Sequence, residues 1–116
     1  MLYFTYNKEE EKMYKILLAC NAGMSTSLLV LRMEKSAQEK GVDVKIMAVG
    51  ITEAESIMED WDIVLLGPQV RHQIKRIEDK ANGTMPVAVI DMRDYGLMNG
   101  EKVLNDALQT IDNFNK

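Results

Sequence analysis

The residue types best suited to covalent chemistry lie in one short stretch, residues 20–27, which reads Cys-Asn-Ala-Gly-Met-Ser-Thr-Ser. Cys20 is the chain's only cysteine; it follows a short apolar run and precedes small and hydroxyl-bearing residues. A turn of this kind between a strand and a helix presents backbone N–H groups and the positive end of the helix dipole, which together bind a phosphate-sized dianion. The positive potential of such a turn also favours the ionised thiolate of a cysteine over its neutral thiol. The stretch therefore predicts a cysteine that accepts a phosphoryl group and passes it on.

We assign the main phosphate-binding role to the loop backbone, whose N–H groups would bind the oxygens of the transferred group. The candidate phosphate-binding residues are Asn21, Ala22, Gly23, Met24, Ser25, Thr26 and Ser27. Gly23 permits a turn that a β-carbon would hinder. The hydroxyls of residues 25–27 either donate to the phosphate or cap the helix, the latter worth about 1 kcal/mol. Met24 is a candidate for the surface that meets a partner.

The elements that must position this loop follow from an alternation of short apolar runs with helical patterns. The runs, rich in branched residues as in strands buried on both faces, are Ile16–Ala19, Val44–Val49, Ile63–Leu66 and Val87–Ile90. The helical patterns cover about Ser27–Lys40, Thr52–Glu59, Val70–Ala81 and Glu101–Phe114. Gly41 is expected to end the first helix, and Thr52 with Glu55 to form a capping box on the second. Right-handed crossovers turn this order into a single α/β domain, an open parallel sheet with helices on both faces.

Ligands of open α/β sheets bind beyond the carboxyl ends of the strands, where the strand order reverses. Three loops are expected to meet there: Cys20–Ser27, Gly67–Val70 and Asp91–Gly100. Gln69 and Tyr95, in the second and third of these loops, are further candidates for the phosphate site. His72 falls off the apolar face of its helix and is expected at the surface. The basic residues at 71, 75 and 76 are interpreted as a solvated helix face, or as charges that steer a phosphodonor.

Composition excludes several classes of protein. The length of 116 residues suits one core, and 47% hydrophobic with 28% charged residues is typical of a soluble globular domain. The net charge of −4 argues against nucleic acid as the main partner. The sequence shows no signal-peptide pattern and no apolar run of the ~18–20 residues needed to cross a bilayer. A single cysteine cannot form an internal disulfide, which fits a reducing compartment. A cytoplasmic protein without membrane insertion is expected. Cys20 and His72 are too few soft ligands for zinc, so we expect no metal and no organic cofactor.

Residues 1–13 differ from the rest, because three aromatic residues precede a charged run. We interpret them as a poorly ordered N-terminal extension and residues 14–116 as the domain. Two alternatives stay open: Met13 as the true start of translation, or an added strand or docking arm formed by Leu2–Tyr6.

The loop motif Cys20-Asn-Ala-Gly-Met-Ser-Thr-Ser-Leu-Leu-Val is followed in order by Val64-Leu-Leu-Gly-Pro-Gln-Val, Val89-Ile-Asp and Tyr95-Gly. Over about residues 14–113 the chain thereby resembles the enzyme IIB component of bacterial sugar phosphotransferase systems, lactose/cellobiose (chitobiose) family. The resemblance implies a four-stranded parallel sheet and a phosphotransferase. A phosphohistidine on a IIA protein would give its phosphoryl group to Cys20. The phosphocysteine would then give it to a disaccharide of the cellobiose, lactose or chitobiose type, held by the membrane-embedded IIC permease.

Other cysteine-loop proteins fit the sequence less well. Low-molecular-weight tyrosine phosphatases carry an arginine six residues after the cysteine, where this chain has Thr26. Without that clamp the loop suits a relay, which must protect its intermediate from water. Arsenate reductases need further thiols, and Gly23 replaces the second cysteine of a thiol oxidoreductase. A non-catalytic, flavodoxin-like binding or regulatory module is the remaining alternative; it would bind a nucleotide or flavin and never be phosphorylated.

Overall fold

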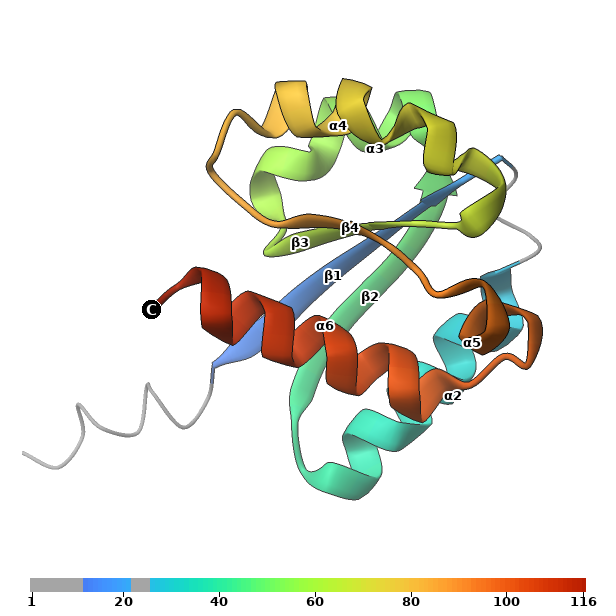
Figure 1. Ribbon diagram of the computed structural model, residues 1–116. Helices are drawn as coiled ribbons and strands as arrows, with labels where there is room; N and C mark the ends of the chain where they lie inside the picture. Colours follow the sequence, from blue (N-terminus) through green and yellow to red (C-terminus); the bar gives the residue numbers. More distant parts are fainter. Residues whose placement is uncertain (1–11, 22–25) are drawn as a thin grey trace, which may run out of the picture.

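The computed structural model describes residues 12–21 and 26–116; residues 1–11 and 22–25 lie outside the described part. Within it, four parallel strands form one sheet in the order β2-β1-β3-β4 (Figure 1). The strands are β1 (Met13–Cys20), β2 (Asp43–Gly50), β3 (Ile63–Leu66) and β4 (Val87–Val89). The strand order reverses at β1, so the switch point lies beyond the carboxyl ends of β1 and β3. The parallel sheet expected from the four apolar runs is confirmed.

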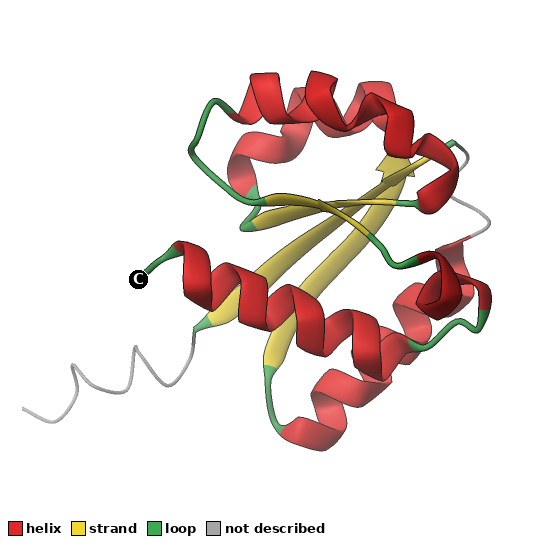
Figure 2. Ribbon diagram, viewed as in Figure 1, coloured by secondary structure: helices red, strands yellow, loops and turns green. Residues whose placement is uncertain are grey.

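Helices cover both faces of the sheet (Figures 1 and 2). On one face lie α2 (Ser27–Lys40) and α6 (Gly100–Phe114), and on the other α3 (Ile51–Ile57) and α4 (Ile74–Ala81). The short helix α5 (Met92–Gly96) and the 3-10 helices η2 (Met58–Asp60) and η3 (Pro68–Gln73) complete the described elements. No helix of the described residues has the length and apolarity needed to cross a membrane.

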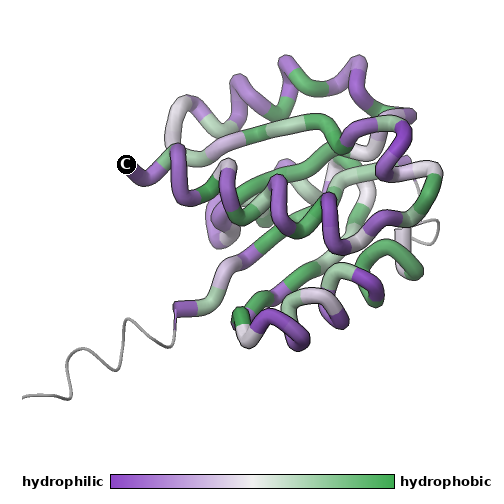
Figure 3. Tube along the Cα trace, turned by 60° about the horizontal axis from the view of Figure 1, so that its bottom comes forward, coloured by the Kyte–Doolittle hydropathy of each residue, from purple (hydrophilic) through white to green (hydrophobic). Residues whose placement is uncertain are grey.

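Strand β1 contributes to two cores, one on each face of the sheet. Ile16 and Leu18 pack beneath α2 and α6, whereas Leu17 and Ala19 pack beneath α3 and α4. All four side chains are fully buried, because successive side chains of a strand point to opposite faces and both faces are covered. In Figure 3 the hydrophobic colour follows the strands, while the outer turns of the helices are mostly hydrophilic.

The first helix has the bounds expected of it, and the second does not. α2 runs from Ser27 to Lys40 and ends at Gly41, whose φ of 70° is the left-handed conformation that glycine adopts most easily. α3 begins at Ile51 with Gly50 at the N-cap position and no side-chain cap. The expected capping box at Thr52 is therefore wrong. Strand β2 leads directly into the helix, and Glu55 binds Arg76 instead, with N–O distances of 2.8 and 2.6 Å.

Two further segments differ from expectation. The helix expected over residues 70–81 is divided into η3 and α4, because Val70 has the non-helical angles φ −117° and ψ 20°. The expected loop at residues 91–100 contains α5, whose first N–H groups are capped by the side chain of Asp91. Both differences lie beside the carboxyl edge of the sheet and shape the loops that meet there.

Candidate functional site

Cys20 is the last residue of the central strand and its side chain is 0% exposed. Its sulfur lies 3.8 Å from the hydroxyl oxygen of Thr26, at the start of α2, and either group can donate. The thiol also donates to the carbonyl oxygen of Val49, near the end of β2, at 3.7 Å. Both contacts are long, as is usual for the weak hydrogen bonds of sulfur. They hold the sulfur between the carboxyl end of β2 and the N-terminus of α2.

A hollow of about 370 Å³, which we call the Cys20 hollow, opens at this end of the sheet. The described residues that line it are Cys20, Asn21, Gly50, Ile51, Thr52, Glu53, Val70, Gln73 and Arg76. Cys20 belongs to the lining of this hollow although the residue has no solvent-exposed surface. The hollow lies at the end of β1, between α3 and the η3–α4 segment.

The predicted loop residues are only partly described. Asn21 is exposed and follows Cys20 directly, and Ser27 is the exposed first residue of α2. Thr26 is fully buried and occupies the N-cap position, but its side chain makes no cap hydrogen bond. Of its two expected roles, capping is wrong, because the hydroxyl lies against the sulfur instead. Ala22, Gly23, Met24 and Ser25 lie outside the described residues.

Gln69 and Tyr95 are 26 positions apart in the sequence, yet the Gln69 Nε2 donates to the Tyr95 hydroxyl at 3.0 Å. The Gln69 side chain of this pair and the Cys20 side chain both lie next to Gly67. A β-carbon added at Gly67 would lie 2.7 Å from the Gln69 Oε1 and 3.4 Å from the Cys20 Cβ, so both side chains border the same point. The described parts of the three expected loops do meet at this end of the sheet.

Sequence reasoning missed the contribution of the β2–α3 junction. Val49 accepts from the thiol, and a β-carbon at Gly50 would lie 3.8 Å from the carbonyl oxygen of Cys20. Thr52 and Glu53 then line the Cys20 hollow. The glycine that directly follows an apolar run was the available signal, but its meaning depends on β2 being the neighbour of β1.

The three basic residues of the third predicted helix have different surroundings. Arg71 donates to the carbonyl oxygen of Pro68 at 2.9 Å, and Lys75 pairs with Asp79 on an exposed helix side at 3.8 Å. Arg76 alone among them lines the Cys20 hollow. His72 is exposed, as expected.

The Arg76–Glu55 pair joins α4 to α3 by two hydrogen bonds. The hydrogen bond from Arg76 lowers the pKa of Glu55, and the same bond raises the pKa of Arg76. Both side chains are therefore charged at neutral pH. The guanidinium also contacts the Thr52 hydroxyl at 3.5 Å, which brings it to the wall of the hollow.

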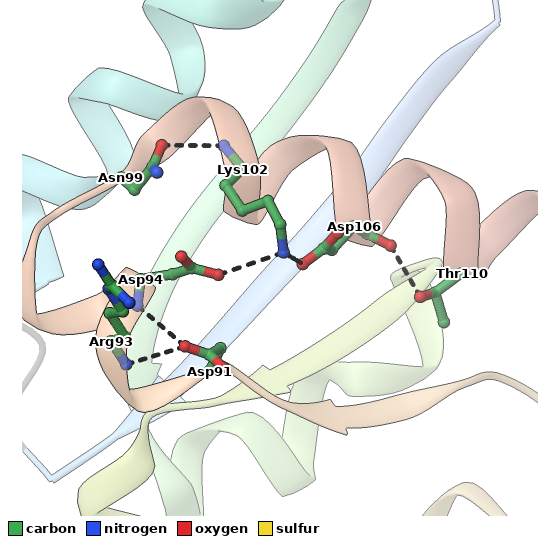
Figure 4. Close-up of polar contacts among 7 residues, drawn as sticks. All are labelled: Asp91, Arg93, Asp94, Asn99, Lys102, Asp106 and Thr110. Atoms are coloured by element: carbon green, nitrogen blue, oxygen red, sulfur yellow. Dashed lines mark hydrogen bonds and ion pairs between the residues drawn. The ribbon is translucent and has the colours of Figure 1, made fainter.

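A polar network holds α5, and with it Tyr95, against α6 (Figure 4). Asp91 accepts from the backbone N–H groups of residues 93 and 94 at 2.9 and 3.1 Å. Lys102 reaches both Asp94, at 3.4 Å, and Asp106, at 2.8 Å. The hydrogen bond to Asp106 raises the pKa of Lys102. Within the described residues, no group of three or more His, Cys, Asp or Glu side chains is placed to hold a metal ion.

Comparison with known sequences finds one family over most of the chain. The family described as "PTS system, Lactose/Cellobiose specific IIB subunit" matches residues 15–106. The oligo-beta-mannoside-specific EIIB component of the PTS system of Bacillus subtilis (strain 168) is 43% identical over 104 residues, covering 87% of this chain and 99% of that protein. The galactose-specific EIIB component of Lactococcus lactis subsp. cremoris (strain MG1363) is 44% identical over 95 residues, covering 77% and 88%.

Solved structures agree with the sequence comparison. The solution structure of a cellobiose-specific phosphotransferase IIB component from Borrelia burgdorferi has a TM-score of 0.76 at 42% identity, covering 89% of this chain and 95% of that one. The lactose-specific IIB domain from Streptococcus pneumoniae has a TM-score of 0.77 at 20% identity, covering 85% and 98%, which is a likeness of fold.

Proposed function

The chain belongs to the lactose/cellobiose-specific IIB family of the phosphotransferase system (PTS), and from this premise we propose that Cys20 is its phosphoryl carrier. As a IIB component the protein is a phosphotransferase of sugar uptake. One observation supports the choice of residue above the others. The chain's only cysteine ends an inner strand at the switch point of the sheet and belongs to the lining of a hollow of about 370 Å³.

The proposed relay has two balanced steps. In the first, the Cys20 sulfur attacks the phosphorus of a phosphohistidine on a IIA protein, so that an S–P bond forms while the N–P bond breaks. The proton lost by the thiol is balanced by the proton that the imidazole gains. In the second step a sugar hydroxyl attacks, an O–P bond replaces the S–P bond, and the hydroxyl proton is balanced by the proton that returns to the sulfur.

The phosphoryl oxygens are proposed to bind the backbone of residues 21–27 and the N-terminus of α2. The contact between Thr26 and the sulfur supports this, because a group on the sulfur would lie beside the first residues of a 14-residue helix. Gln69 and Tyr95 are proposed as further phosphate contacts, since Gln69 borders the same point as Cys20.

The proposed partners are the IIA phosphodonor and the IIC permease of a PTS, both in transient contact with this chain in the cytoplasm. The relatives are named for oligo-beta-mannosides, galactose and cellobiose. For this chain we propose a disaccharide of the cellobiose, lactose or chitobiose type, selected by the permease rather than by the cysteine loop.

The test is to incubate the protein with phosphoenolpyruvate, the general PTS proteins and a cognate IIA protein, and to measure its intact mass. Wild type is expected to gain one phosphoryl group, which Cys20→Ala abolishes. His72→Ala is the matched control, because it removes an exposed side chain that can also carry phosphate, and it should behave as wild type. A phosphoryl group retained by Cys20→Ala, or no phosphorylation of wild type, contradicts the proposal.

A further inference from the structure

A phosphoryl group on Cys20 creates a charge problem that the loop itself does not solve. The group carries about −1.5 to −2 charges at neutral pH, and residues 20–27 contain no lysine or arginine. Backbone N–H groups supply only partial charges. Any full positive charge beside the group would come from elsewhere in the chain or from a partner.

Arg76 is the one basic side chain that lines the Cys20 hollow among the described residues. Its Nε and Nη2 donate to the two carboxylate oxygens of Glu55, and Nη2 also contacts the Thr52 hydroxyl. None of its hydrogen bonds with described residues involves Nη1. A guanidinium has five N–H donors in a planar fork, so Arg76 has donors left for a second anion while Glu55 holds it.

The exposure of this ion pair indicates that its main value is not stability. The side chains of Arg76 and Glu55 are 40% and 25% exposed, and ion pairs of this kind contribute little to folding because water screens them. What the pair does accomplish is to fix a flexible side chain at the wall of the hollow. Fixed in this way, the guanidinium loses less conformational freedom when an anion arrives.

We propose that Arg76 is an anion-binding residue that pairs with the phosphoryl group on Cys20, and that Glu55 holds its guanidinium ready in the unphosphorylated protein. This inference rests on the proposed function of Cys20. The incoming group is a dianion, and it would bind the guanidinium through the donors that Glu55 does not use. The phosphorylated form gains a charge-assisted contact that the thiol form lacks.

The experiment compares two variants that each remove one positive charge from the same helix. Arg76→Gln removes the cation of the hollow, and Lys75→Gln removes its neighbour, which is 85% exposed and pairs only with Asp79 among the described residues. The readout is the equilibrium constant for phosphoryl transfer from phosphorylated IIA, measured by mass spectrometry at several ratios of the two proteins. Arg76→Gln is expected to lower this constant about tenfold or more, the size of one charge-assisted hydrogen bond, and Lys75→Gln to change it less than about twofold.

A third variant separates anion binding from a structural role. Glu55→Gln breaks the same ion pair but keeps the cation, so a structural role predicts the same loss as in Arg76→Gln. The proposal predicts a clearly smaller loss than in Arg76→Gln, because the cation is kept and only its fixed position is lost. Arg76→Lys keeps the positive charge but loses the planar fork of N–H donors. Its equilibrium constant should therefore lie between those of Arg76→Gln and wild type.

The outcomes are distinguishable from those of the proposed function. If wild type is phosphorylated and Arg76→Gln matches Lys75→Gln, this inference is overturned while the role of Cys20 stands. Equal losses in Glu55→Gln and Arg76→Gln overturn it as well, in favour of a structural pair. If wild type accepts no phosphoryl group, the proposed function fails and this inference with it.

Discussion

At Gly100 the helix α6 lies close against the backbone of α2, and adding a single methyl group there tests the packing of the two helices. A β-carbon at this position would lie 2.5 Å from the carbonyl carbon of Arg32 and 2.6 Å from the backbone nitrogen of Met33. Both are backbone atoms, which cannot rotate aside as a side-chain end can. Gly100→Ala therefore forces the helices apart by several tenths of an ångström or more.

The expected cost follows from the number of contacts that such a shift disturbs. Leu104 and Ala107 of α6 are buried with Leu29 and Met33 of α2 in one core. Overpacking of a dense core costs about 1–3 kcal/mol, and the smaller entropy of the unfolded alanine chain returns only about 0.4–1 kcal/mol. We expect Gly100→Ala to lower the free energy of unfolding by about 1.3 kcal/mol, the difference between these two effects. This corresponds to a fall in Tm on the order of 5 °C for a domain of this size.

Urea unfolding followed by circular dichroism measures this effect, with Gly96→Ala as the matched control. Gly96 is exposed in α5, and a β-carbon there meets nothing within 4 Å. Its replacement should leave stability within about 0.5 kcal/mol of wild type. If Gly100→Ala is as stable as Gly96→Ala with an unchanged m-value, the helices are not packed as closely as described and the reasoning is wrong.

Three more predictions concern the site and its supports. Gly67→Ala should displace the Gln69 side chain, because its Oε1 would lie 2.7 Å from the new β-carbon. The proposed phosphoryl transfer to Cys20 should then be slower. The urea midpoint should change little, because the φ of −62° at this position suits alanine. Asn99→Ala removes the side chain that accepts from the Lys102 N–H at 3.1 Å, and calorimetry should report a loss of about 1 kcal/mol, whereas Asn99→Asp should retain stability. Arg76 lowers the pKa of Glu55, so their pairing stabilises the fold above the ordinary carboxyl range and is lost as pH falls through that lowered pKa. The difference between the urea midpoints of wild type and Glu55→Gln should accordingly become smaller in acid. A difference that grows as the pH falls would contradict the predicted direction of this pH dependence.

The strands and the position of Cys20 at the end of the first strand were predictable because they depend on local pattern. A run such as Ile63–Leu66 is apolar throughout, and only a strand covered on both faces buries every residue of it. The end of α2 at Gly41 was predictable for a similar reason, since glycine adopts the left-handed conformation there without strain.

What could not be predicted depends on contacts between distant residues. Thr52 and Glu55 have the spacing of a capping box, but Glu55 binds an arginine 21 residues further along the chain. α5 has five residues, too few for a helical period to be recognised. The part played by Val49 and Gly50 at the site follows from strand order, which no local pattern records.

The central position of β1 has a consequence for the way the protein loses activity. Its backbone is hydrogen-bonded to β2 on one side and β3 on the other, and each layer of helices rests on its side chains. Amide protons in such a strand exchange with solvent only when the whole domain opens. Cys20 ends a strand that opens only with the whole domain. A gently heated sample should therefore contain folded molecules with β1 intact and fully unfolded molecules, and few partly unfolded ones.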